Sequence, residues 1–95
     1  MLIRSQDKTA LVKFENVVIN LKLPESLRVI CWSLQDAQRS GGYFVLGEYS
    51  AKEKAMKVLD MIQKRYEEYE TERIYKEGVY GIETFQMPED SEVEV

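Results

Sequence analysis

The sequence predicts an α+β protein in which an antiparallel β-sheet of about five to six strands packs against one long C-terminal α-helix. Two observations predict this fold. In the first half of the chain, apolar residues alternate with polar ones or gather in short β-branched runs, as in strands. After residue 50 the apolar spacing changes to that of one helix face. The pattern leaves open whether the sheet is strongly curled.

The first strands are short and are separated by polar turns. Met1–Arg4 is mostly apolar, and Leu11–Phe14 is expected to pair back on it as a hairpin across the polar turn Ser5–Thr9. The segment Val17–Leu23 then alternates with a period of two, which is typical of a half-buried strand. Pro24 ends this strand, because proline cannot donate a hydrogen bond to a ladder.

Two further strands are expected on either side of a polar loop at Asp36–Gly42. The earlier strand, Leu27–Leu34, is apolar on both faces, so the middle of the sheet is expected to be covered on both sides. Dimerisation is one way to cover the second face. In the later strand, Tyr43–Tyr49, Gly47 indicates a bulge or a close backbone approach.

The helix is expected to run from Ala51 to about Glu72 and to end before Gly78 and Gly81. Ser50 and Glu53 have the spacing of a capping box at its start. Apolar side chains form one stripe along it, at Ala55, Val58, Leu59, Ile62, Tyr66 and Tyr69.

After the helix, Ile82–Phe85 is expected to add a last short strand. The remaining residues are mostly polar and acidic. We therefore expect one α+β domain over residues 1–86, followed by a mobile acidic tail over residues 87–95.

Composition excludes several kinds of function. The 95 residues include no His and one Cys, which excludes Ser-His-Asp and Cys-His catalytic units, disulfides within the chain and Cys-cluster zinc sites. Cys31 lies in an apolar run and is expected to be a buried thiol. No paired-carboxylate or phosphate-loop motif is present. We expect no catalytic, cofactor or metal residues, and therefore no enzyme.

The targeting signals are also absent from the sequence. The N-terminus has no long apolar region of the kind found in a secretory signal. No stretch approaches the roughly 20 apolar residues that span a bilayer. Together with the single Cys, these observations predict a cytoplasmic protein with no membrane partner.

Charge is distributed unevenly along the chain. Residues 1–65 carry 11 basic and 7 acidic residues, whereas residues 66–95 carry 2 basic and 10 acidic residues, a net charge of −8. Such a segment is either a solvated surface or a site that attracts a basic partner. The candidate partner-binding residues are Tyr66, Glu67, Glu68, Tyr69, Glu70, Glu72, Tyr75, Glu77 and Tyr80. For Tyr66 and Tyr69, core packing is the alternative, because they continue the apolar stripe.

Four segments are similar to a family of small proteins from phages and prophages of Gram-positive bacteria. Their sequences are IRSQD at residues 3–7, LGEYS at 46–50, AMKVLDMI at 55–62 and FQMP at 85–88. The resemblance spans nearly the whole chain. It implies an early strand, a strand leading into the helix and a terminal strand. It implies no reaction, and it places the protein in the cytoplasm of a bacterial host.

The sequence leads to three hypotheses of different classes. The first is a non-catalytic protein that inhibits a basic, nucleic-acid-handling host protein; its most specific form is an anti-CRISPR protein that binds a CRISPR effector nuclease. The second is a structural or accessory module that forms a homodimer. The third, a minor one, is nucleic-acid binding through the basic N-terminal part, which the interleaved carboxylates disfavour.

Overall fold

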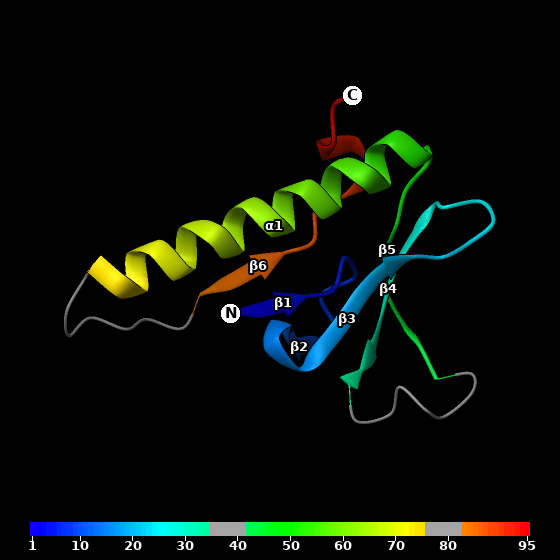
Figure 1. The fold of residues 1–95 in the computed structure, drawn as a ribbon. Helices are drawn as coiled ribbons and strands as arrows, with labels where there is room; N and C mark the ends of the chain where they lie inside the picture. Colours follow the sequence, from blue (N-terminus) through cyan, green and yellow to red (C-terminus); the bar gives the residue numbers. More distant parts are fainter. Residues whose placement is uncertain (35–41, 76–82) are drawn as a thin grey trace.

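The structure is a computed structural model, and it describes residues 1–34, 42–75 and 83–95. The chain is α+β, as predicted (Figure 1). Short 3-10 turns lie at Phe14–Asn16 (η1) and Asp90–Glu92 (η3). The described strands and helix are β1 (Leu2–Arg4), β2 (Leu11–Lys13), β3 (Val17–Leu21), β4 (Arg28–Ser33), β5 (Phe44–Glu48), α1 (Lys52–Tyr75) and β6 (Thr84–Gln86).

The strands form two three-stranded sheets, so the prediction of one antiparallel sheet is wrong. One sheet has the order β3-β4-β5 and is antiparallel throughout. The other has the order β2-β1-β6, with β1 antiparallel to β2 and parallel to β6. A parallel pair needs a long crossover connection, and the segment that contains α1 supplies it. Short hairpins therefore account for only part of the topology.

The two sheets meet at Gln6, directly after β1. The Gln6 amide nitrogen donates to the carbonyl oxygen of Leu46 at 2.7 Å. Its side-chain Nε2 donates to the Glu48 carbonyl at 3.0 Å, and its Oε1 accepts from the Glu48 amide at 3.0 Å. One residue thus occupies the free edge of β5 much as a neighbouring strand would.

Helix α1 buries the predicted stripe. Ala55, Val58 and Ile62 are at most 3% exposed and belong to one core cluster with residues of β1, β4 and β5. The helix continues past Glu72 to Tyr75. The expected stop signals Gly78 and Gly81, and most of the expected loop Asp36–Gly42, lie outside the described residues.

The irregularity predicted at Gly47 is present. Val29 is opposite Gly47 while the next residue, Ile30, is opposite Val45, so Leu46 is an extra residue in β5. A Cβ atom on Gly47 would lie 3.0 Å from the Tyr49 hydroxyl oxygen. Glycine is therefore required here because the Tyr49 side chain approaches the backbone closely.

The segment after residue 86 packs against the domain, which corrects the expectation of a mobile tail. Met87 is 1% exposed and Val93 is 3% exposed, and both belong to the core cluster. The Tyr49 hydroxyl donates to the Pro88 carbonyl at 2.9 Å. Buried apolar side chains and hydrogen bonds thus attach this otherwise polar segment, and the domain extends beyond residue 86.

Asp90 joins this segment to the start of α1. Its Oδ1 accepts hydrogen bonds from the Ser50 amide at 2.8 Å and the Ser50 hydroxyl at 3.1 Å. The Ser50 hydroxyl, which was expected to cap the first turn of α1, thus donates to Asp90, a residue far away in the sequence. The Lys54 ammonium group lies 3.5 Å from the other carboxylate oxygen.

Candidate protein-binding surface

Four of the predicted carboxylates, Glu67, Glu68, Glu70 and Glu72, lie in the C-terminal half of α1, whose end extends past β6 and β1 in the view of Figure 1. Glu67, Glu68 and Glu72 are exposed. Glu70 is half-buried and has an interaction of its own. We call Glu67, Glu68 and Glu72 the acidic face.

Tyr66 and Tyr69 lie on the inner side of the helix. Both are half-buried and pack against the core cluster. The rings of Tyr66 and Phe14 have centroids 4.3 Å apart, and those of Tyr66 and Tyr69 are 6.2 Å apart. The two tyrosines therefore fix this part of α1 on η1, and the carboxylates form the exposed side.

The other candidate residues cannot be placed on the acidic face. Tyr75 is the last residue of α1, and its side chain is outside what the structure describes. Glu77 and Tyr80 also lie outside the described residues.

Arg65 connects the helix to the start of the last strand. Its guanidinium group lies 2.5 Å from a carboxylate oxygen of Glu83 and 3.4 Å from one of Glu68. The hydrogen bond with Glu83 raises the pKa of Arg65 above its ordinary value. The sequence did not predict the ion pair of Arg65 with Glu83, because the two residues are far apart in the chain and no local pattern relates them.

The acidic face keeps a negative charge after these pairs are counted. Residues 63–72 together with Glu83 carry five carboxylates against the cations of Lys64 and Arg65. Glu67 accepts a hydrogen bond from the neutral Gln63 amide at 3.1 Å. Like charges at positions i and i+4, as at Glu68 and Glu72, destabilise a helix by a few tenths of a kcal/mol. A cationic partner would remove that repulsion.

The acidic face also has a shape that fits a side chain. A shallow hollow on the outside of the helix is lined by Lys64, Glu67, Glu68, Thr71 and Glu72. Three of these five residues are carboxylates, so an Arg or Lys side chain of a partner would find several acceptors within a small area.

The described residues offer neither a metal site nor a reactive thiol. No group of three or more Cys, Asp or Glu side chains among them is arranged to hold a metal ion. Cys31 is 2% exposed, and burial raises the pKa of its thiol, which keeps the reactive thiolate form rare. No helix in residues 1–34, 42–75 and 83–95 combines the length and the apolar character that a membrane span requires.

Comparison of the chain with protein-family models, with curated proteins and with solved structures found no match. A function must therefore be argued from the physical chemistry of the surface. The acidic face is the predicted site that the structure places on the exterior, on a helix held by contacts on its opposite side.

Proposed function

We propose that this protein is a non-catalytic binding protein that covers a basic surface of a nucleic-acid-handling protein, using Glu67, Glu68 and Glu72 as its main contacts. The observation that supports the proposal is the exposure of these carboxylates on the outer side of α1. Contacts of Tyr66 with Phe14 and of Arg65 with Glu83 hold the same helical segment from within. A preorganised charged surface loses little entropy on binding.

The spacing of the carboxylates favours a partner that normally holds nucleic acid. The three glutamates of the acidic face lie within residues 67–72, which rise about 7.5 Å along the helix axis, or one negative charge per roughly 2.5 Å. Duplex DNA carries one negative charge per roughly 1.7 Å of its axis. A groove lined with Lys and Arg for phosphates would therefore meet a similar linear charge density on this helix.

The most specific form of the proposal is inhibition of an RNA-guided nuclease, that is, an anti-CRISPR activity. The support for this form is the resemblance of the four sequence segments to phage and prophage proteins. The chemistry of the acidic face by itself suits any partner with an exposed phosphate-binding groove.

The test compares capture of a partner from a bacterial host lysate by the original protein and by two charge-reversed variants. In the test variant, Glu67→Lys, Glu68→Lys and Glu72→Lys reverse the acidic face. The matched control reverses three exposed carboxylates elsewhere, with Glu53→Lys, Asp60→Lys and Glu94→Lys. Both variants change the net charge equally, and Lys is a good helix former.

We expect the original protein and the control variant to capture the same nucleic-acid-binding protein, and the test variant to lose it. Capture should also weaken as salt is added, because an exposed charged interface is screened. Equal capture by all three proteins would refute the proposal. A second measurement, circular dichroism, establishes that each variant keeps its helix.

A further inference from the structure

Strand β5 is an end strand of the β3-β4-β5 sheet, and the outer edge of an end strand carries backbone groups that another strand can bind. The segment Tyr43–Gly47 is uncharged and mostly apolar. Tyr43, Phe44 and Val45 are 46%, 42% and 37% exposed. An exposed apolar edge strand of this kind is prone to pair with a strand of another chain.

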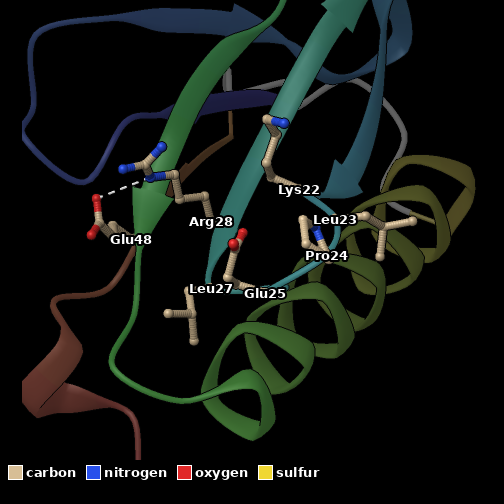
Figure 2. A pocket seen from close by; sticks show the side chains of 7 residues that line it. All are labelled: Lys22, Leu23, Pro24, Glu25, Leu27, Arg28 and Glu48. Carbon is tan, nitrogen blue, oxygen red and sulfur yellow. Dashed lines mark hydrogen bonds and ion pairs between the residues drawn. The ribbon is translucent and has the colours of Figure 1, made fainter.

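The charged residue of β5 is directed to its own sheet. Glu48 lies opposite Arg28 of β4, and its carboxylate is 3.3 Å from the Arg28 guanidinium group (Figure 2). Both side chains line the hollow beside the turn that follows β3. A charged side chain often protects an edge strand from pairing, but here the carboxylate is paired with the neighbouring strand. The backbone edge of β5 therefore depends on another group for its protection.

The Gln6 side chain occupies the backbone groups of Glu48 at this edge. Its Nε2 donates to the Glu48 carbonyl and its Oε1 accepts from the Glu48 amide, each at 3.0 Å. Two bonds exchanged with one residue are the pattern of a hydrogen-bonded pair in an antiparallel ladder. With the bond from the Gln6 amide to the Leu46 carbonyl, Gln6 takes up three groups that an incoming strand would need.

Contacts of the surrounding residues hold Gln6 in this position. Its Nε2 also donates to the Pro88 carbonyl at 3.1 Å, in the segment that packs after β6. The Gln86 side chain donates to the carbonyl of Ser5 at 2.9 Å. Ser5 is 1% exposed, and its hydroxyl donates to the Asp7 carboxylate at 2.7 Å. A side chain that is already held in place loses little entropy when it binds, so it competes well with a strand from solution.

We propose that Gln6 protects the edge of β5 from pairing with β5 of a second copy of the chain. A second copy is the competitor because it carries the same uncharged, apolar edge. In an antiparallel pair centred on Val45, Glu48 of one copy would lie opposite Gly42 of the other, so like charges would not oppose the pairing. The proposal does not rest on the proposed function, because Gln6 contacts β5 and the last segment, whereas the acidic face lies on α1.

The first test is hydrogen–deuterium exchange of the backbone amides in Gln6→Met, whose side chain has a similar length and no amide group. We expect the Glu48 amide to exchange about tenfold faster or more than in the original protein, because its acceptor is gone. The Tyr49 amide, which donates to the Leu27 carbonyl at 2.8 Å within the sheet, is the internal control and should keep its rate. An unchanged rate at Glu48 would refute the proposal.

The second test is the molecular mass, measured by sedimentation velocity from about 1 µM to about 1 mM. The original protein and the control Gln63→Met, at an exposed glutamine of α1, should stay at 11.1 kDa, whereas Gln6→Met should associate. Adding Val45→Lys to Gln6→Met should restore the monomer, because lysine on an edge strand opposes pairing. Adding Leu11→Lys instead, at a residue of β2 that is 58% exposed, should not restore it.

Two results of the second test would overturn the proposal. One is a Gln6→Met protein that stays monomeric at every concentration although its Glu48 amide exchanges rapidly. The other is association that Val45→Lys leaves unchanged, which would assign it to another surface. If Gln6→Met also exposes the Tyr49 amide and is therefore partly unfolded, Gln6→Asn replaces it in both tests, since its shorter polar side chain cannot span the same distance to Glu48.

Discussion

Gly47 shows how one residue connects a strand, a buried tyrosine and the last segment of the chain. A Cβ at this position would lie 3.0 Å from the Tyr49 hydroxyl and 3.3 Å from the Met87 Cε. Tyr49 is 2% exposed and donates a hydrogen bond to the Pro88 carbonyl, so its ring has little freedom to move away. The side chain of glycine is therefore the only one that fits without displacement.

Gly47→Ala is expected to destabilise the protein by about 1–3 kcal/mol, the usual effect of excess volume in a packed interior. Gly42→Ala is the control, because no atom lies within 4 Å of a Cβ built there. Urea denaturation of the two variants measures the difference. Equal stability of the two would contradict the packing described around Tyr49.

Asp90 gives the stability a dependence on pH. The hydrogen bond from the Ser50 amide is the largest of the interactions that lower the pKa of Asp90 below its ordinary value. Hydrogen bonds from Thr9 and Ser5 lower the pKa of Asp7 to about 2. For Glu15, burial is the largest single influence and raises the pKa, but the hydrogen bond and charge of the N-terminal ammonium group, a backbone hydrogen bond and the charge of Lys13 together lower it.

A carboxyl group with a lowered pKa in the folded state stabilises the protein above its pKa in the unfolded state, about 4. This stabilisation is lost as the pH falls through the folded-state pKa. The melting temperature should therefore fall between about pH 4 and pH 2. Asp90→Asn should have a lower melting temperature than the original protein at pH 7, and this difference should shrink as the pH falls below about 4. A difference that persists unchanged at pH 2 would contradict the role of Asp90.

At the scale of elements, the sequence predicted the features that depend on residues close together in the chain. The stripe from Ala55 to Tyr69 identified the helix, and Gly47 identified the irregular strand. The pairing of β1 with β6 was not predictable in this way, because the two strands are about 80 positions apart. No local pattern in either strand indicates which strand it pairs with. The last segment was wrongly expected to be mobile, because the prediction rested on its acidic composition and gave no weight to its two apolar residues Met87 and Val93, which are buried.

The packing of this last segment is testable at two valines. Val93→Asp would place a carboxylate where the side chain is 3% exposed, and it should cost about 2 kcal/mol or more. Val95→Asp, where the side chain is 75% exposed, should change the stability by less than about 0.5 kcal/mol. Thermal denaturation at pH 7 compares them. A mobile segment would give two variants of equal stability.

At the scale of the whole molecule, α1 and the β3-β4-β5 sheet share the core and present different chemistry outward. Around residues 67–72 the helix presents carboxylates, whereas the sheet presents apolar side chains such as Phe44 and Val45. The sequence predicted the acidic residues and the two-sided strand. For Tyr66 and Tyr69 it left core packing open, because both continue the apolar stripe, and the structure bears out that alternative. It did not predict that Phe14 is the partner of Tyr66, because the two residues meet only through the tertiary fold.

The central claim is that the acidic face takes the place of nucleic acid on a partner. The most direct measurement is a competition in which the captured partner holds a fluorescent nucleic acid and unlabelled protein is added. The original protein and the control variant with Glu53, Asp60 and Glu94 reversed should displace the nucleic acid. The variant with Glu67, Glu68 and Glu72 reversed should not displace it at concentrations at least a hundredfold higher, about 2.7 kcal/mol in binding free energy. Displacement by that variant at the original concentration, or no displacement by the original protein, would contradict the claim.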